Sequence, residues 1–416
     1  MDFDMLEDLL QNEQTPPTDI KVVGIGGAGG NAINRMIASG LKKVTFVAMN
    51  TDIQALQRSN AQIRMPLGRE LTGGLGAGGV PDVGEKAAEE SREEIKKLLT
   101  DTDMVFITAG MGGGTGTGGA SVVAEISREV NALTVAVVTT PFAFEGKKKL
   151  QLALEGIEKL RKQVDTLILI PNQYLLKVVE NNTPIKKAFL LADDVLRQGV
   201  QGISELITEP GEINIDFADV KTVMKGRGDA LMGIGVGEGT TRAVDAARAA
   251  INNPLLENAS IDGAKSVLVN LAGGDGLTLQ EYQDVVELIT ENCAEDALII
   301  AGQAYNPELG EKIKVTVVAT GFERPHEDFE EQIEVIDYKR RKAEGPTLQP
   351  KQPPQGERQQ PAASARTGKD EQDEEVITVN RWQDLQQQLG NRQQSNDYSF
   401  PAVLRYQRGE DGDSQG

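Results

Sequence analysis

The sequence contains very few of the side chains that bind zinc or form disulfide bonds. Its 416 residues include a single cysteine, Cys293, and a single histidine, His326. One cysteine excludes an intrachain disulfide framework and is typical of a protein of a reducing compartment. A zinc site built from histidine and cysteine side chains is excluded as well, because such a site needs several of them.

Positive charge and long apolar runs are also scarce. There are 43 Lys and Arg against 63 Asp and Glu, a formal net charge of −20 at pH 7. Nucleic-acid binding and adsorption to anionic lipid both need clustered positive charge, so both are disfavoured. No run reaches the roughly 20 apolar residues that span a bilayer, and the acidic start MDFDMLEDLL does not resemble a secretory signal. We therefore expect a cytoplasmic protein that binds no nucleic acid and does not insert into a membrane.

Apolar runs alternate with helical patterns from Ile20 to about Ile207. Five runs are almost entirely apolar, as expected for parallel strands covered on both faces: KVVGI, VTFVAMN, MVFITA, LTVAVVTT and TLILIP. Segments with helical periodicity lie between them, such as VGEKAAEESREEIKKLL. This alternation predicts a doubly wound α/β domain.

The remainder of the chain divides by composition. A long helical pattern ends before Pro210-Gly211, and a second series of strands and helices, a smaller α/β domain, follows it. After about Arg324 the chain is rich in Gln, Pro, Glu and Arg, which predicts disorder, and the apolar and basic island DYSFPAVLRYQR is typical of a docking peptide. The predicted parts are a flexible extension (1–19), a nucleotide-binding domain (20–183), a connecting helix (184–208), the smaller α/β domain (209–322), a linker (323–395), a docking peptide (396–408) and an acidic extension (409–416).

Two glycine-rich loops directly follow predicted strands. The first, GIGGAGGN, places Gly24, Gly26 and Gly29 in the G-x-G-x-x-G spacing. That spacing alone indicates dinucleotide binding only weakly, because a tight turn between a strand and a helix also produces it. The second loop is GMGGGTGTGG, in which successive backbone N–H groups can converge on phosphate oxygens, and Thr115 and Thr117 add hydroxyl donors.

A third glycine-dense segment, TGGLGAGG, runs from Thr72 to Gly79. Three such segments favour a longer polyphosphate than the pyrophosphate of NAD. The chain has no Walker A motif, and its glycine loops contain no lysine. A triphosphate would therefore depend on backbone amides, helix dipoles and a Mg²⁺ ion bound through the phosphates, with no metal ligand from the protein.

Nine segments occur in the order in which a known family has them: GIGGAGGNA, NTDIQAL, GLGAGG, GGGTGTGG, VTTPFAFEGKKK, IPNQYL, ADDVLRQGVQGISELI, NIDFADVKTVM and VTVVATG. The chain resembles the tubulin/FtsZ superfamily in these segments, and most closely its bacterial cell-division branch, from Lys21 to about Phe322. The tail resembles the family's C-terminal peptide at Pro401, Leu404 and Arg405. The resemblance implies a GTPase that stacks head to tail into protofilaments and forms the division ring beneath the inner membrane. Its C-terminal peptide would dock on membrane-anchoring and regulatory division proteins.

The resemblance also implies a set of GTP-binding residues. In it the glycine loops contact the phosphates, Glu145 and Asn172 bind the ribose region, and Phe189 packs on the base. A carboxylate at Asp193 would accept from the N1–H and N2–H₂ edge of guanine, whereas adenine presents an acceptor at N1. At Lys149 the family often has arginine, which has a forked donor set that lysine lacks. The full set is Gly27, Ala28, Gly29, Gly30, Asn31, Gly78, Gly113, Gly114, Thr115, Gly116, Thr117, Glu145, Lys149, Asn172, Phe189 and Asp193.

The segment NIDFADV follows Pro210-Gly211 and permits two interpretations. From the residues alone, Asp216 is the N-cap of a helix and Asp219 lies in its first turn. The resemblance implies that Asn214 shapes a contact with the next subunit, where Asp216 and Asp219 orient the water that attacks GTP. The active site would then be shared between two molecules.

Two rival functions stay open at this point. An NAD-dependent oxidoreductase would use the first glycine loop but leaves the second loop unexplained. A structural polymer could hold GTP without hydrolysing it, in which case the two acids would only cap the helix.

Overall fold

The computed structural model describes residues 18–177, 182–209, 211–253 and 263–322. The predicted linker and docking peptide, with Pro401, Leu404 and Arg405, lie outside the described residues, as does most of the predicted N-terminal extension.

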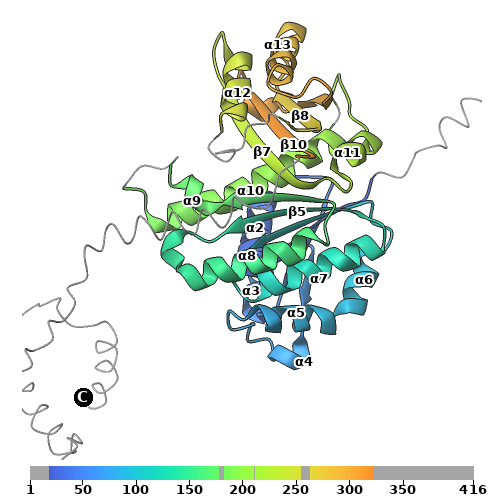
Figure 1. Ribbon diagram of the computed structural model, residues 1–416, viewed down its shortest axis with the longest axis vertical. Helices are drawn as coiled ribbons and strands as arrows, with labels where there is room; N and C mark the ends of the chain where they lie inside the picture. The colour runs from blue at the N-terminus through green and yellow to red at the C-terminus, as the bar shows by residue number, and fades with distance from the viewer. Residues whose placement is uncertain (1–17, 178–181, 210, 254–262, 323–416) are drawn as a thin grey trace, which may run out of the picture. The chain divides into compact units, whose positions relative to one another are not determined.

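The described strands form one sheet (Figure 1). In spatial order they are β3 (Ile63–Pro66), β2 (Thr45–Asn50), β1 (Ile20–Ile25), β4 (Met104–Gly110), β5 (Leu133–Thr140), β6 (Thr166–Pro171), β7 (Gly228–Gly237), β10 (Ile313–Thr320), β8 (Ser266–Gly273) and β9 (Leu298–Tyr305). From β3 to β7 all neighbours are parallel. The predicted mixed α/β class is confirmed, and the five apolar runs are β1, β2, β4, β5 and β6.

Helices follow most strands. They are α2 (Gly26–Ala38), α3 (Ile53–Gln57), α4 (Arg69–Thr72), α5 (Pro81–Glu90), α6 (Arg92–Leu99), α7 (Thr115–Glu129), α8 (Lys147–Arg161), α9 (Asn172–Leu175), α10 (Ile185–Thr208), α11 (Phe217–Met224), α12 (Arg242–Ile251) and α13 (Leu279–Thr290). Two short 3-10 helices, η1 (Ala143–Glu145) and η3 (Pro307–Leu309), complete the described elements. Within these described segments, no helix is both long enough and apolar enough to cross a membrane.

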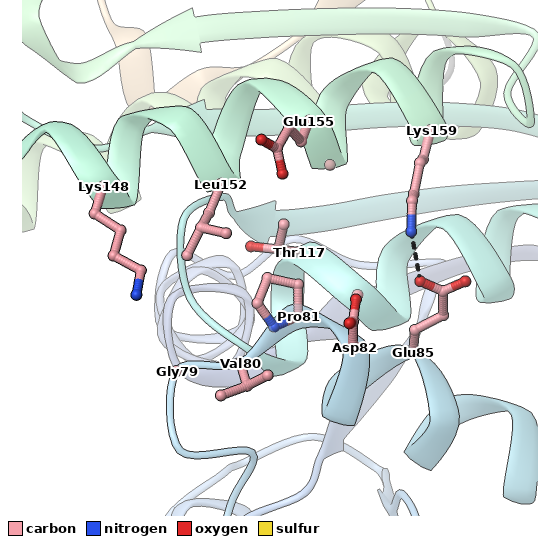
Figure 2. Close-up of a pocket in the computed structure, with 12 residues that line it drawn as sticks. Gly79, Val80, Pro81, Asp82, Glu85, Thr117, Lys148, Leu152, Glu155 and Lys159 are labelled. Carbon is pink, nitrogen blue, oxygen red and sulfur yellow. Dashed lines mark hydrogen bonds and ion pairs between the residues drawn. The ribbon is translucent and has the colours of Figure 1, made fainter.

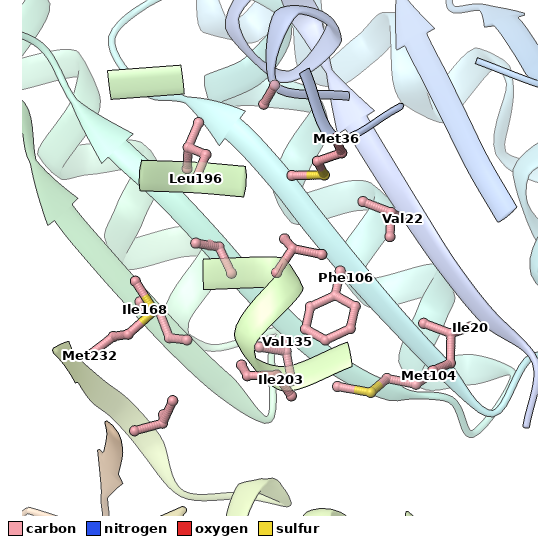
Figure 3. Packing of buried hydrophobic residues seen from close by; sticks show 14 of the residues in the cluster. Ile20, Val22, Met36, Met104, Phe106, Val135, Ile168, Leu196, Ile203 and Met232 are labelled. Carbon is pink, nitrogen blue, oxygen red and sulfur yellow. The ribbon is translucent and has the colours of Figure 1, made fainter. Parts of the chain in front are cut away.

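The side chains of the central strands are divided between the two faces of the sheet. On β4, Met104 and Phe106 point to the face covered by α2 and α10, whereas Val105 and Ile107 point to the face covered by α5, α6, α7 and α8. Figure 3 shows the first of these cores, with Leu196 of α10 lying over the strands. Period-two alternation with both faces buried explains why these strands are apolar throughout.

One predicted helix is divided in the structure, and the two predicted α/β parts share one sheet. The predicted helical pattern VGEKAAEESREEIKKLL forms two helices, because the helix is interrupted at Ser91. The Ser91 Oγ accepts a hydrogen bond from the Gly68 N–H at 3.2 Å. The sheets of the two predicted α/β domains are also continuous, since β6 pairs with β7 from Thr166–Gly228 to Ile168–Ala230. Beyond β7 the sheet becomes mixed, with β10 antiparallel to both of its neighbours.

Candidate functional site

The order of the strands fixes where a ligand can enter. Along the sheet the chain order reverses between β1 and β4, the two strands that carry the glycine-rich loops. In open parallel sheets, ligands bind outside the carboxyl ends of the strands at such a switch point. A hollow of about 270 Å³ lies there, and we call it the switch-point hollow. It is lined by Ile25, Gly26, Gly27, Ala28, Gly110, Met111, Gly112, Gly113, Gly114, Thr115, Gly116, Thr139, Thr140, Pro141, Glu145, Lys149, Asn172, Phe189, Ala192, Asp193 and Leu196.

Most of the predicted GTP-binding residues line this hollow. They come from the two glycine loops, from η1 and α8, and from α9 and α10: Gly27, Ala28, Gly113, Gly114, Thr115, Gly116, Glu145, Lys149, Asn172, Phe189 and Asp193. The other predicted residues lie outside the lining. Gly29, Gly30 and Asn31 continue along α2, Gly78 precedes α5, and Thr117 lines a different hollow.

The glycines of the first loop fall into two groups. A Cβ on Gly29 would lie 2.4 Å from the Thr108 carbonyl oxygen, and Gly26 has φ +73°, so the fold itself requires glycine at both positions. Gly27 and Gly30 have no atom of the described structure within 4 Å of such a Cβ, and the same holds for Gly113 in the second loop. Neither packing nor a left-handed backbone explains these three glycines. They leave a bare cradle at the helix starts, and a phosphate chain would fit it.

Two helix N-termini face the hollow. Helices α2 and α7 begin there, neither has a side-chain cap, and neither has an acidic residue in its first turn. The backbone N–H groups and the positive dipole ends therefore stay available to an anion. Thr115, the first residue of α7, is fixed by a 2.7 Å hydroxyl contact with Thr51, and Thr117 Oγ1 accepts from the Gly112 N–H at 2.8 Å.

An aromatic cluster and a carboxylate form the other end of the hollow. The Phe189 ring lies edge-on to Phe142 at a centroid distance of 5.3 Å and is partly exposed, which leaves a ring surface for a planar ligand. Asp193 lies one turn further along α10 and forms an ion pair with Arg35 of α2, Nε to Oδ2, at 3.3 Å. Burial raises the pKa of the Asp193 carboxyl, and the hydrogen bond from Arg35 partly offsets that rise.

Between these ends lie Glu145, Lys149 and Asn172. Glu145 Oε1 accepts from the Phe142 N–H at 2.9 Å, and its Oε2 pairs with Lys149 Nζ at 3.2 Å. Asn172 is buried, and its Oδ1 has no hydrogen-bond partner in the described structure. Buried polar atoms nearly always have a partner, so an unpaired oxygen in the wall of a hollow indicates a missing donor. The hydroxyl of a ribose is a donor of that kind.

A second hollow of about 300 Å³ lies between α5, α7 and α8 (Figure 2). Its charged side chains are largely exposed and of both signs, and Lys159 pairs with Glu85 at 2.7 Å. Thr117 is the predicted GTP-binding residue in its wall. The two glycine loops that follow β1 and β4 line the switch-point hollow instead, whereas Gly79 of the third glycine-dense segment lines this second hollow.

The predicted catalytic residues lie outside the lining of the switch-point hollow. Asn214, Asp216 and Asp219 are exposed at the start of α11, and none of them lines the switch-point hollow. Asn214 Oδ1 accepts from the Gly211 N–H at 2.8 Å. Asp216 caps α11 by accepting from the Asp219 N–H, so the capping interpretation describes this segment in a single chain. In the described part of the chain, no three His, Cys, Asp or Glu side chains form a group that could hold a metal ion.

Sequence reasoning missed Arg35. It lies 158 residues from Asp193, and no local pattern links a basic residue in the last turn of α2 to an acid on α10. Only the packing of α2 against α10 brings the two side chains together.

The fold is an α/β sheet with a glycine-lined hollow at the switch point of its parallel part. The model of the Tubulin/FtsZ family GTPase domain matches residues 19–180, and that of the FtsZ family C-terminal domain matches residues 228–323. Among solved structures, an empty FtsZ dimer from M. jannaschii is 47% identical, with a TM-score of 0.73, over 77% of this chain and 93% of that chain. The chain belongs to the FtsZ family, as the sequence predicted, and carries its GTPase domain.

Two further solved structures are similar. A point mutant of the M. jannaschii FtsZ is 46% identical, with a TM-score of 0.71, over 77% of this chain and 96% of that chain. CetZ2 from Haloferax volcanii, a GTPγS-bound protofilament, is 20% identical, with a TM-score of 0.63, over 79% of this chain and 100% of that chain. This last likeness shows a shared fold.

Proposed function

We propose that this chain is a GTP-hydrolysing cytoskeletal protein that polymerises head to tail and forms the division ring of a bacterial cell. One observation supports a shared active site: Asp216 and Asp219 are not part of the lining of the switch-point hollow, where the phosphates would bind. A second copy whose α11 segment docks on the hollow would supply them. Family membership and the dimer and protofilament found among similar proteins support this arrangement.

GTP would lie along the hollow with its phosphates on the starts of α2 and α7 and its base against Phe189 and Asp193. Backbone N–H groups and two helix dipoles would hold most of the phosphate charge. A Mg²⁺ ion, when bound to the phosphates, would neutralise further charge and keep most of its waters. The protein's own groups, Asp216 and Asp219 from the neighbour, would orient the attacking water, since phosphoryl transfer depends mainly on positioning and electrostatics.

Hydrolysis would then control the filament. Assembly would complete each active site. Loss of the γ-phosphate would weaken the contact between adjacent subunits, and subunits would turn over. The proposed docking peptide, with Pro401, Leu404 and Arg405, would bind membrane-anchoring and regulatory division proteins at the division site beneath the inner membrane. Many weak tethers along one filament would add through avidity. Deleting residues 396–416 should abolish anchor binding and leave GTP hydrolysis unchanged.

The test of the main proposal is phosphate release from GTP over a series of protein concentrations, with ATP as the control. Activity that appears only above a threshold concentration supports a site completed by a neighbour. A rate per molecule that stays constant down to high dilution contradicts the shared site, because each monomer would then carry its whole active site.

The capping role of Asp216 favours one second candidate, a polymer that binds GTP without hydrolysing it. Filaments that form with GTP but release no phosphate would support that candidate. The oxidoreductase alternative is set aside, because the family to which the chain belongs is a GTPase family.

A further inference from the structure

The carboxylate proposed to recognise guanine is hydrogen-bonded to Arg35. Arg35 Nε donates to Asp193 Oδ2 at 3.3 Å, from the last turn of α2 to the middle of α10. The Asp193 side chain is 15% exposed and that of Arg35 is 30% exposed, so the pair lies partly out of water at the wall of the hollow.

We propose that Arg35 is a positioning residue for base selection, which holds Asp193 ionised and oriented so that the hollow accepts guanine and rejects adenine. This inference rests on the proposed function, in which Asp193 recognises the base. It assigns a role in selectivity to a residue outside the lining of the hollow.

Asp193 can keep its hydrogen bond with Arg35 while it binds guanine. A carboxylate has about four acceptor positions on its two oxygens. The single Nε donor occupies one of them on Oδ2, so Oδ1 and the remaining position on Oδ2 can accept the N1–H and N2–H₂ groups of guanine. Arg35 therefore does not have to leave when the base binds, and its hydrogen bond restrains the position of Asp193 Oδ2.

Among the groups around Asp193, Arg35 is the one that favours its ionised form. Burial raises the pKa of Asp193, and the neighbouring Asp194 raises it further, whereas Arg35 lowers it. Asp194 itself pairs with Arg197 at 2.7 Å. The other charged groups that line the hollow, Glu145 and Lys149, pair with each other. Among these groups, Arg35 is the cation bonded to Asp193.

Protonation of Asp193 would change what the site recognises. A protonated carboxyl presents one O–H donor and one C=O acceptor. That pattern matches the N1 acceptor and the N6–H₂ donor of adenine, and it no longer accepts two hydrogen bonds from guanine. Without Arg35, the site should therefore lose its preference for guanine as the pH falls.

The experiment compares Arg35→Gln with Arg35→Lys, which keeps the positive charge. Arg128→Gln is the matched control, because Arg128 also lies in the last turn of a helix and, among the described residues, donates to a backbone carbonyl, that of Lys162. Affinities for GTP and ATP are measured on the full chain by nucleotide titration from about pH 8 down to about pH 5. Thermal unfolding checks that each variant is folded.

For Arg35→Gln we expect GTP affinity to fall by about tenfold per pH unit below the pKa of Asp193, and the GTP-to-ATP ratio to narrow by about tenfold. Arg35→Lys and Arg128→Gln should follow the wild-type profile. An Arg35→Gln variant that keeps the wild-type pH profile and selectivity overturns the inference, and so does one that loses both nucleotides equally at every pH.

A fourth variant separates this inference from the proposed function. Asp193→Asn removes the carboxylate and should abolish the preference for guanine. If Asp193→Asn keeps that preference, the proposed base site itself is wrong. If Asp193→Asn loses it while Arg35→Gln does not, only the role of Arg35 is wrong.

Discussion

Asp216 Oδ1 accepts a hydrogen bond at 2.8 Å from the backbone N–H of Asp219, in the first turn of α11. The cap uses one oxygen of Asp216, and both side chains remain exposed. The same two residues can therefore stabilise the helix in one chain and face a nucleotide in the next. The two roles can be separated by substitution.

Asp216→Asn should keep the cap and remove the charge, because asparagine caps helices as well as aspartate does. We expect its free energy of unfolding to change by less than about 0.5 kcal/mol, whereas Asp216→Ala should lose about 1 kcal/mol. Both variants and Asp219→Ala should bind GTP normally but release phosphate about 100-fold more slowly. Nucleotide titration, phosphate release and urea unfolding measure the three quantities. A wild-type rate of phosphate release in any of these variants contradicts the catalytic role of that residue.

Gly27→Ala tests the phosphate cradle. Its new Cβ would meet no described atom within 4 Å, and Gly27 lies in a helix, so stability should be unchanged or rise by about 0.5–1 kcal/mol. GTP affinity should fall by about tenfold or more, because the methyl group would stand where the phosphates approach the backbone.

Gly118→Ala is the matched control for that substitution. Its Cβ would lie 2.0 Å from the Pro81 carbonyl oxygen, so α5 and α7 would have to separate, at a cost of about 1–3 kcal/mol. Thermal unfolding should show a loss of stability for Gly118→Ala alone, and nucleotide titration should show a loss of GTP affinity for Gly27→Ala alone. Equal GTP affinity for Gly27→Ala and the wild type would mean that no phosphate approaches that position.

Asn172→Leu removes the unpaired buried oxygen from the wall of the hollow. The substitution keeps a similar volume, so the fold should tolerate it, but nucleotide affinity should fall by about tenfold if a ribose hydroxyl donates to Oδ1. Asn270 of β8 also has an unpaired buried Oδ1, and it does not line the hollow. Asn270→Leu should therefore leave nucleotide affinity unchanged, even though it removes the hydrogen bond to the Gly202 carbonyl. If both variants bind nucleotide like the wild type, Asn172 does not contact the ligand.

The sequence predicted those features that a local pattern encodes. Strands buried on both faces are apolar throughout, and a glycine loop after a strand indicates an anion site, so β1, β4 and the loops of the hollow were found. Strand β3 was missed, because it is short, lies at the sheet edge and is only partly buried.

Features that depend on distant contacts were not predictable in this way. The pairing of β6 with β7 and the bond from Arg35 to Asp193 arise when remote segments pack together, and no periodicity records either of them. The break at Ser91 depends on Gly68, which lies 23 residues earlier in the chain.

The part of the sheet beyond β7 is flanked by a network of charged hydrogen bonds centred on Arg242. Arg242 of α12 donates to Glu281 of α13, Nε to Oε1 at 2.6 Å, and to the carbonyl oxygens of Gly276 and Glu311, each at 2.6 Å. The hydrogen bond from Arg242 is the main reason why the pKa of Glu281 lies below its usual value, and the bonds from Thr278 lower it further. A carboxyl whose pKa is lower in the folded state stabilises the fold above its unfolded pKa, and this contribution is lost as the pH falls through the folded pKa.

Arg242→Ala should therefore lower the free energy of unfolding by about 2 kcal/mol at pH 7, and its deficit relative to the wild type should shrink as Glu281 becomes protonated in acid. Urea unfolding at neutral pH and at about pH 3, well below the usual pKa of a glutamate, measures both effects. Arg248→Ala, an exposed site on the same helix, should cost less than about 0.5 kcal/mol at either pH. A deficit for Arg242→Ala that is the same at both pH values would mean that the backbone carbonyls, rather than Glu281, account for the contribution of Arg242.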